Sequence, residues 1–161
     1  QSSLFSHLSN TNQEEIMRAD SSVISISMLG LDALYQYRGL QLKGQAIYSF
    51  NKNVEQYNQF GNADLGKEIF GYYLEAAYNL LATKDTDCRL SPFVRYENFD
   101  TQYALSPGTV KNPESHRKVV VAGLSYYPTP ELVLKADMQW IKTDSSSDSK
   151  KSLNIGFGFM F

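Results

Sequence analysis

Residues 120–142 read VVAGLSYYPTPELVLKADMQWIK. On both sides of the turn at 127–130, apolar residues occupy every second position, from Val120 to Tyr126 and again from Leu132 to Trp140. Alternation with a period of two is typical of a β-strand that has one apolar face. Two such runs joined by a short turn rich in proline indicate an antiparallel hairpin. The stretch therefore predicts two paired strands with a common apolar face.

The same alternation recurs along most of the 161 residues, and Tyr, Phe, Val and Leu dominate it, as strands prefer. It predicts seven strands, at 25–38, 40–50, 69–82, 88–99, 117–127, 131–142 and 151–161. No long stretch has the pattern of a helix, which argues against βαβ folds. The sequence therefore predicts an all-β chain.

The predicted connections alternate between short and long. The short ones are Arg38-Gly39, 83–87 and 127–130, and the long polar ones are 51–67, 100–116 and 143–150. Short turns at one end and long loops at the other are typical of an antiparallel up-and-down transmembrane β-barrel. A soluble sandwich usually has Greek-key connections without this asymmetry.

Composition excludes several other classes. The 15 Lys and Arg against 17 Asp and Glu give a net charge of −2, which argues against a partner held through nucleic-acid phosphates. A single cysteine, Cys88, rules out an internal disulfide framework. No apolar run approaches the roughly 18 residues of a transmembrane helix. A β-barrel stays compatible with this composition, because its strands alternate apolar and polar residues.

The two faces of the predicted strands differ sharply. One face is apolar throughout, and we expect it to contact lipid; we assign to it Leu74, Leu134, Trp140, Phe157, Phe159 and Phe161. The opposite face is mixed, and we expect it to line a lumen; its charged residues include Lys43, Glu75, Arg89, Arg95, Glu97, Lys135 and Asp137. A soluble barrel or sandwich with the apolar face inside is the alternative.

Three features favour lipid on the outside. Aromatic residues gather near the predicted strand ends, as in the two interfacial girdles of membrane barrels. Small residues such as Gly44 and Ala136 recur in mid-strand on the apolar face, where a dry core would need larger side chains. The chain ends on alternating Phe157, Phe159 and Phe161, which resembles the assembly signal of outer-membrane barrels.

Four segments together resemble the C-terminal part of a porin: LGKEIFGYYLEAAYNLL (65–81), LSPFVRYENFDTQ (90–102), AGLSYYPTPELVLKADMQW (122–140) and LNIGFGFMF (153–161). The family they resemble is the phosphate-selective porin O and P family of Gram-negative bacteria. The resemblance covers about 65–161 well and 25–50 loosely, and it implies a closed barrel of about 16 strands. It does not carry phosphate selectivity over, because the family's constriction loop belongs to its N-terminal part.

Strand parity supports the same organisation. A complete barrel of this type has an even number of strands and both ends in the periplasm, whereas a count of seven strands makes the first one begin on the outer side. We therefore expect residues 1–24 to be a polar extracellular loop segment, and 25–161 to be the C-terminal part of a barrel. The expected partners are outer-membrane lipid and the missing N-terminal strands, with a homotrimer as one assembly.

The sequence offers no catalytic constellation. The two histidines, His7 and His116, lie in predicted loops, and neither a Gly-x-Ser-x-Gly motif nor metal-ligand spacing occurs. We therefore expect no enzyme, metal or cofactor. The sequence predicts a Gram-negative outer-membrane porin segment for passive diffusion of small hydrophilic solutes or ions, leaning weakly toward anions. The alternative is a structural or partner-docking barrel with a plugged pore.

Overall fold

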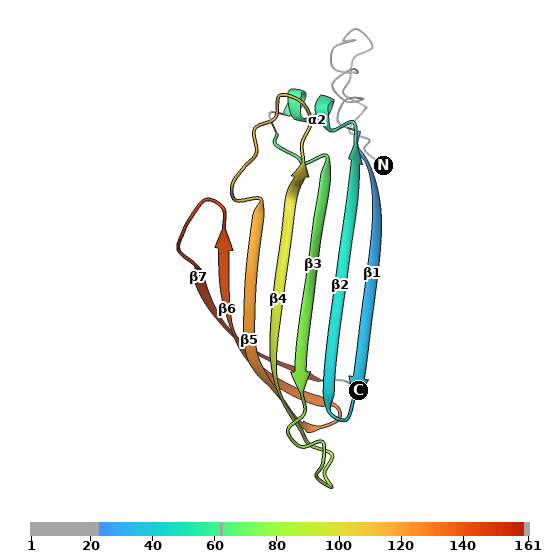
Figure 1. The fold of residues 1–161 in the computed structure, drawn as a ribbon, viewed down its shortest axis with the longest axis vertical. Helices are drawn as coiled ribbons and strands as arrows, with labels where there is room; N and C mark the ends of the chain where they lie inside the picture. The colour runs from blue at the N-terminus through green and yellow to red at the C-terminus, as the bar shows by residue number, and fades with distance from the viewer. Residues whose placement is uncertain (1–22, 62, 160–161) are drawn as a thin grey trace, which may run out of the picture.

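A computed structural model describes residues 23–61 and 63–159 of the chain. These residues form one antiparallel sheet whose seven strands are hydrogen-bonded in chain order, with β1 and β7 at its two ends (Figure 1). The all-β, up-and-down prediction is therefore confirmed. No helix among the described residues is long and apolar enough to cross a bilayer.

The strands run over 10 to 16 residues each. They are β1 Ser25–Tyr37, β2 Leu40–Lys52, β3 Glu68–Tyr78, β4 Arg89–Ala104, β5 His116–Thr129, β6 Leu132–Thr143 and β7 Lys150–Phe159. A short helix, α2 Val54–Gly61, lies between β2 and β3.

The register places the predicted apolar residues in continuous rows on one face. One row joins Ala33, Gly44, Leu74, Tyr96 and Val120 across the first five strands. Trp140 continues this row opposite Val120. Because side chains alternate between faces along each strand, the charged residues predicted for the other face share rows of their own.

Solvent exposure differs between these faces. Leu74 is 61% exposed, Ile155 79% and Phe157 81%, so the apolar face is uncovered from β3 to β7. The buried apolar side chains in the sheet lie on the opposite face, where Val121 is 2% and Phe93 8% exposed. The sheet thus has the inverse arrangement of a soluble β-protein, in which apolar side chains point into a core.

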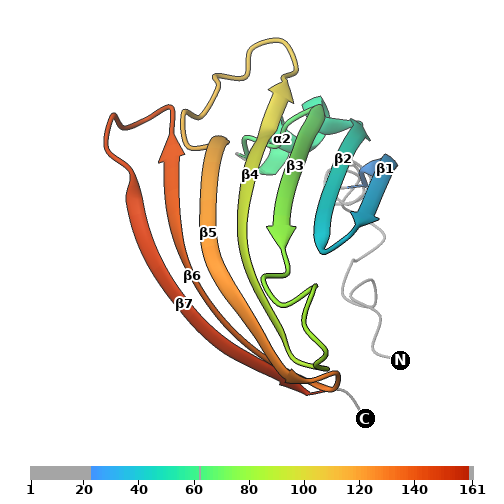
Figure 2. The ribbon, with the colours of Figure 1, turned by 60° about the horizontal axis from the view of Figure 1, so that its bottom comes forward.

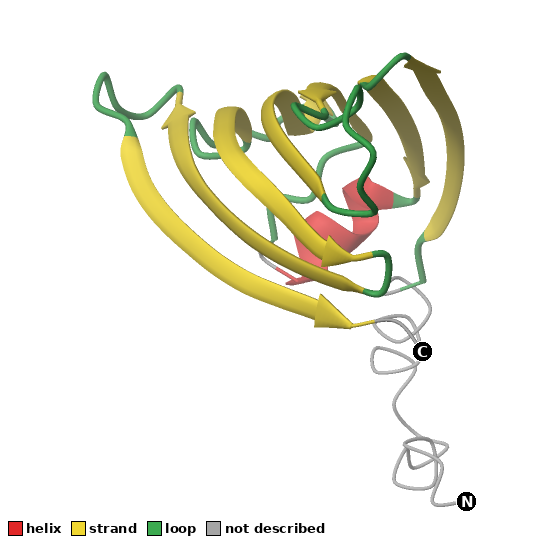
Figure 3. Ribbon diagram, turned by 90° about the horizontal axis from the view of Figure 1, so that it is seen from below, coloured by secondary structure: helices red, strands yellow, loops and turns green. Residues whose placement is uncertain are grey.

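The sheet is strongly curved (Figure 2). In the view along the strands, β1 and β7 bend toward the same side, and α2 lies within the curve (Figure 3). The hollow lined by the mixed face lies on this concave side. The apolar face is therefore convex and the charged face concave.

Two glycines are required by local geometry. The turn from β1 to β2 has positive φ at both Arg38 (44°) and Gly39 (87°), the conformation of the tight hairpin turns that match strand twist. A side chain at Gly39 would also begin 2.6 Å from the Cβ of Ala82. At Gly123, a Cβ would lie 2.5 Å from the carbonyl oxygen of Ala136 and 2.8 Å from the ring of Phe93. Gly123 thus lets β5 and β6 approach beneath that ring.

Several predicted boundaries were wrong. β3 ends at Tyr78 rather than at 82, and a turn-rich connection, 79–88, replaces the expected short one. β4 continues to Ala104, well into the predicted loop 100–116. Helix α2 occupies part of the predicted polar connection 51–67.

The position of two apolar-face residues along their strands bears on the membrane interpretation. Tyr96 pairs with Leu74 in the middle of β4. Leu134 is the third residue of β6 and so lies near its end. Phe161 and residues 1–22 lie outside the described residues, as does most of the predicted loop segment 1–24.

Candidate functional site

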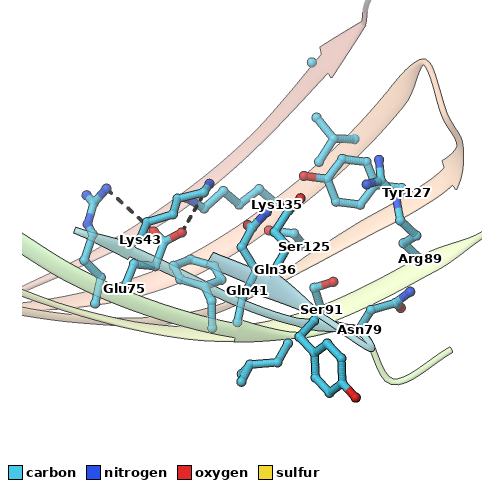
Figure 4. Close-up of a pocket in the computed structure, with 18 of the residues that line it drawn as sticks. Gln36, Gln41, Lys43, Glu75, Asn79, Arg89, Ser91, Ser125, Tyr127 and Lys135 are labelled. Carbon is cyan, nitrogen blue, oxygen red and sulfur yellow. Dashed lines mark ion pairs between the residues drawn. The ribbon is translucent and has the colours of Figure 1, made fainter. Parts of the chain in front are cut away.

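The concave face contains a hollow of about 880 Å³ toward the end with the short turns. Strands β1 to β7 all contribute to its lining (Figure 4). Its charged lining residues are Arg38, Lys43, Arg89, Arg95, Lys135 and Glu75. Five basic groups against one carboxylate make this hollow electropositive.

A chain of ion pairs crosses the concave face in the middle of β2, β3 and β4. Glu75 lies between two cations, with 3.5 Å to the Nζ of Lys43 and 3.9 Å to an Nη of Arg95. The other Nη of Arg95 lies 2.6 Å from a carboxylate oxygen of Glu97. Cross-strand pairing of Lys43, Glu75 and Arg95 in one row produces this arrangement. The alternating signs fix the four side chains against the wall and partly neutralise one another.

One atom in this group of ion pairs is left without a partner. The Nε of Arg95 is buried and makes no hydrogen bond in the structure. The Cζ of Arg95 lies over the ring of Tyr73, 5.5 Å from its centroid, while its two Nη atoms form ion pairs with carboxylates. Arg95 is therefore the most tightly held of the cations on this face.

A second charged pair lies on β6. The Nζ of Lys135 is 3.8 Å from a carboxylate oxygen of Asp137 and 4.4 Å from the ring centroid of Phe93. Asn154 on β7 donates a hydrogen bond of 2.9 Å to Asp137. Arg89 stands apart from both groups, with its guanidinium 4.2 Å from the ring centroid of Tyr127.

Part of the concave wall is apolar rather than polar. Phe93, Val119 and Val121 form a small buried cluster, against which Ala77, Phe99 and Ile141 pack. The Nζ of Lys135 lies over the ring of Phe93 in this cluster, a cation–π arrangement that places a charged group beside the apolar surface. The concave wall is therefore polar and solvated only in part.

At the long-loop end, a buried polar network ties the connections to the sheet. Asp100, 7% exposed, accepts hydrogen bonds from the backbone N–H of Gln102 (2.8 Å), from Ser115 (3.2 Å) and from Lys111. A carboxylate that loses its water on burial needs such donors, because an unpaired buried charge is costly. Asp100 thereby anchors the loop that follows β4.

The network continues to the connection that contains α2. The side chain of Gln102 donates to the carbonyl of Asp64 and accepts from the backbone N–H of Asn112 at 2.6 Å. Asn58 of α2 exchanges two hydrogen bonds with the backbone of Leu65, at 2.9 and 3.0 Å. The loops at this end are therefore joined to each other and to β4 by side-chain hydrogen bonds.

The structure brings four of the predicted concave residues together: Lys43, Glu75, Arg95 and Glu97. It pairs Lys135 with Asp137 separately and leaves Arg89 near the short-turn end. Among the predicted apolar-face residues, Leu74, Trp140 and Phe157 lie in the convex-face rows. Sequence reasoning missed Asp100 and Gln102, because the polar stretch 100–102 does not continue the alternating run 90–99.

No family model matches the chain, and no solved structure matches it. An uncharacterized protein of Aquifex aeolicus (strain VF5) is 41% identical over 71 residues, which are 44% of this chain. The match spans only 16% of that relative, which is therefore much longer than this chain. The resemblance to the phosphate-selective porin O and P family stays a prediction.

Proposed function

We propose that this chain forms part of the wall of an outer-membrane β-barrel porin, through which small hydrophilic solutes and ions diffuse passively. In this proposal the convex face contacts lipid and the concave face lines the lumen. The seven strands are the C-terminal part of a larger barrel, and strands from the rest of the protein pair with the edges of β1 and β7. The localisation proposed is the outer membrane of a Gram-negative bacterium.

The observation that carries the proposal is the exposed apolar convex face. Its side chains, from Leu29 on β1 to Phe157 on β7, are largely uncovered, while charged residues occupy the concave side. Contiguous apolar patches on soluble monomers seldom exceed a few hundred Å². A face that extends over seven strands needs an apolar surrounding, and lipid supplies one that matches its alternation.

Strand length agrees with this proposal. A transmembrane β-strand needs about 9–11 residues at a tilt of about 45°. The shortest strand, β7, has 10 residues and the longest, β4, has 16. The greater length of the Aquifex relative also leaves room for further strands beyond the matched segment.

The charges on the concave face suggest a preference for anions. By the strand register and the lining of the hollow, seven basic residues, Arg38, Lys43, Arg89, Arg95, Arg117, Lys135 and Lys150, oppose four acidic ones, Asp32, Glu75, Glu97 and Asp137. Charged groups on a pore wall tune ion preference, and the excess of basic residues favours anions. We do not extend the proposal to phosphate selectivity.

A second candidate is a barrel with a plugged lumen that serves as a structural or docking element. Two observations favour it: α2 lies on the concave side, and Lys43, Glu75, Arg95 and Glu97 meet in one ion-pair chain. Both features would narrow a lumen.

Conductance of the complete gene product in a planar bilayer separates the two candidates. A porin gives stepwise, long-lived ion currents that scale with salt concentration. A protein that folds in the same membrane but passes no current would refute the porin and support the plugged barrel. A protein that stays soluble and monomeric without detergent would refute both.

A further inference from the structure

The apolar convex face ends in a group of lysines at the long-loop end of β5, β6 and β7. Lys118 on β5 lies directly opposite Lys142 on β6 in the register. Lys151 on β7 lies opposite Trp140. Because Trp140 precedes Lys142 by two residues on β6, Lys151 is a diagonal neighbour of Lys142. All three side chains are exposed. We call Lys118, Lys142 and Lys151 the rim lysines.

The rim lysines belong to the convex face rather than to the lumen side. Lys118 and Lys142 continue the row that runs from Leu31 through Ala46, Tyr72 and Asn98. The next row toward the middle of the sheet contains Leu74, Tyr96, Val120 and Trp140, followed by Lys151. The rim lysines therefore border the apolar rows directly, with the half-buried Trp140 between them and the apolar surface.

Two like charges placed directly opposite each other on a sheet destabilise it, because their Cβ atoms lie only about 4.5–5.5 Å apart. Within the described residues, none of the rim lysines takes part in an ion pair. The carboxylate of Asp144 is near enough for Lys118 to help lower its pKa, but its hydrogen bond goes to His116, at 2.8 Å. The cluster is thus a concentration of positive charge in which the described residues form no direct ion pair and Asp144 lies near Lys118 alone.

We propose that the rim lysines bind the phosphate groups of a membrane lipid whose acyl chains lie along the convex face. The proposal rests on the proposed function, since it needs lipid at that face. Charge complementarity identifies the headgroup, because three ammonium groups within two rows of a sheet fit a doubly charged phosphate or a pair of them. Contact with the apolar rows identifies a lipid rather than a free anion. A lipid can place its phosphate groups on the rim lysines and its acyl chains along the apolar rows at the same time.

The position of the rim lysines at the long-loop end indicates which leaflet the bound lipid belongs to. In a barrel with short periplasmic turns, the long-loop end faces outward, so the bound lipid belongs to the outer leaflet. A basic cluster at the edge of a membrane surface strengthens attraction to anionic headgroups by a roughly additive amount for each lysine. A phosphorylated glycolipid such as lipid A combines the required phosphates with acyl chains.

The test measures lipid A bound to the complete gene product. The protein is folded in neutral detergent, titrated with diphosphorylated lipid A, and the bound lipid is counted by native mass spectrometry. The double variant Lys118→Gln/Lys142→Gln should bind lipid A roughly 30-fold more weakly than the parent protein. The matched control, Lys43→Gln/Lys135→Gln, removes the same charge from the concave face and should bind like the parent. If the double variant does not fold, the single variants Lys142→Gln and Lys151→Gln take its place, each with a several-fold loss expected.

Two further arms distinguish the sources of phosphate. Lipid A stripped of its phosphates should bind the parent as weakly as the double variant binds the intact lipid. Inorganic phosphate at a tenfold excess over lipid A should not displace the lipid; displacement would mean an ordinary anion site. Equal binding of lipid A by the parent and the double variant would overturn the proposal. Measurements of ionic current on the same samples separate this outcome from failure of the porin proposal. A protein that conducts ions, but whose parent and double variant bind lipid A equally, refutes only the rim-lysine site.

Discussion

Replacement of Leu74 by arginine tests which face of the sheet contacts lipid. Leu74 is 61% exposed on the convex face and lies midway between Phe70 and Tyr78 on β3. Eight steps of about 3.3 Å separate those two aromatic residues, or about 26 Å along the strand. At a tilt of about 40° this is about 20 Å across the membrane, so Leu74 lies about 10 Å from either end.

Arginine on the lipid face at this depth costs about 2–4 kcal/mol. We therefore expect Leu74→Arg to lower the free energy of unfolding by that amount, or to block insertion. The assay is urea unfolding of the complete gene product in lipid vesicles, with heat-dependent electrophoretic mobility as a measure of the folded fraction. The same change at Leu134, two residues into β6, should cost less because Leu134 lies nearer the membrane surface.

The matched control is Gln45→Arg. Gln45 faces the concave side and lies opposite Tyr73. It is therefore at almost the same level as Leu74, which pairs with the adjacent Gly44. Its side chain donates a hydrogen bond to Asp32. An arginine there gains a carboxylate partner and should change stability by less than about 1 kcal/mol. If Gln45→Arg proves as damaging as Leu74→Arg, or if Leu74→Arg is harmless, the assignment of faces is wrong.

Three further predictions concern the loops and the concave face. Asp100→Ala should cost about 1–3 kcal/mol, because it leaves Lys111 and a buried backbone N–H without their acceptor, and proteolysis of the 105–115 loop should accelerate; unchanged cleavage would contradict the anchoring role. The hydrogen bond with His116 lowers the pKa of Asp144 below its ordinary value of 3.8. The stabilisation from this contact is therefore complete above pH 3.8 and is lost as the pH falls through the lowered pKa of Asp144. Hydrogen exchange in 143–150 should rise only in that acidic range. Arg95→Gln removes one cation of the concave face and should shift the reversal potential toward cation preference in a salt gradient, whereas no shift would place Arg95 outside the conducting path.

Much of the fold could be predicted from sequence because the information is local. A period of two is visible in any short window, so the seven strands and the residues that share a face followed directly from the alternation. The tight turn at Arg38-Gly39 was equally readable, since adjacent residues with positive φ favour glycine.

The errors arose where the pattern changes or where distant residues cooperate. β4 continues past Phe99 because the hydrogen bonds of Asp100 and Gln102 hold its polar end, and the alternation gives no hint of them. α2 has only 8 residues, lies in a polar segment and begins at the buried Val54. A helix this short repeats its apolar positions too few times for the period to be detected in the sequence. The ion-pair chain through Glu75 depends on the register of three strands, which hairpin lengths alone did not determine.

The buried cluster of Phe93, Val119 and Val121 gives the sheet an uneven distribution of local stability. It links β4 and β5 through side-chain packing, and Ile141 extends it to β6, whereas every residue of β1 is exposed. Regions with few buried contacts open first, so amide protons should exchange fastest in β1 and slowest around Val121. During assembly, β4, β5 and β6 can therefore hold together as a cooperative unit before the edges have found their neighbours, and the remaining strands add to a surface that is already curved.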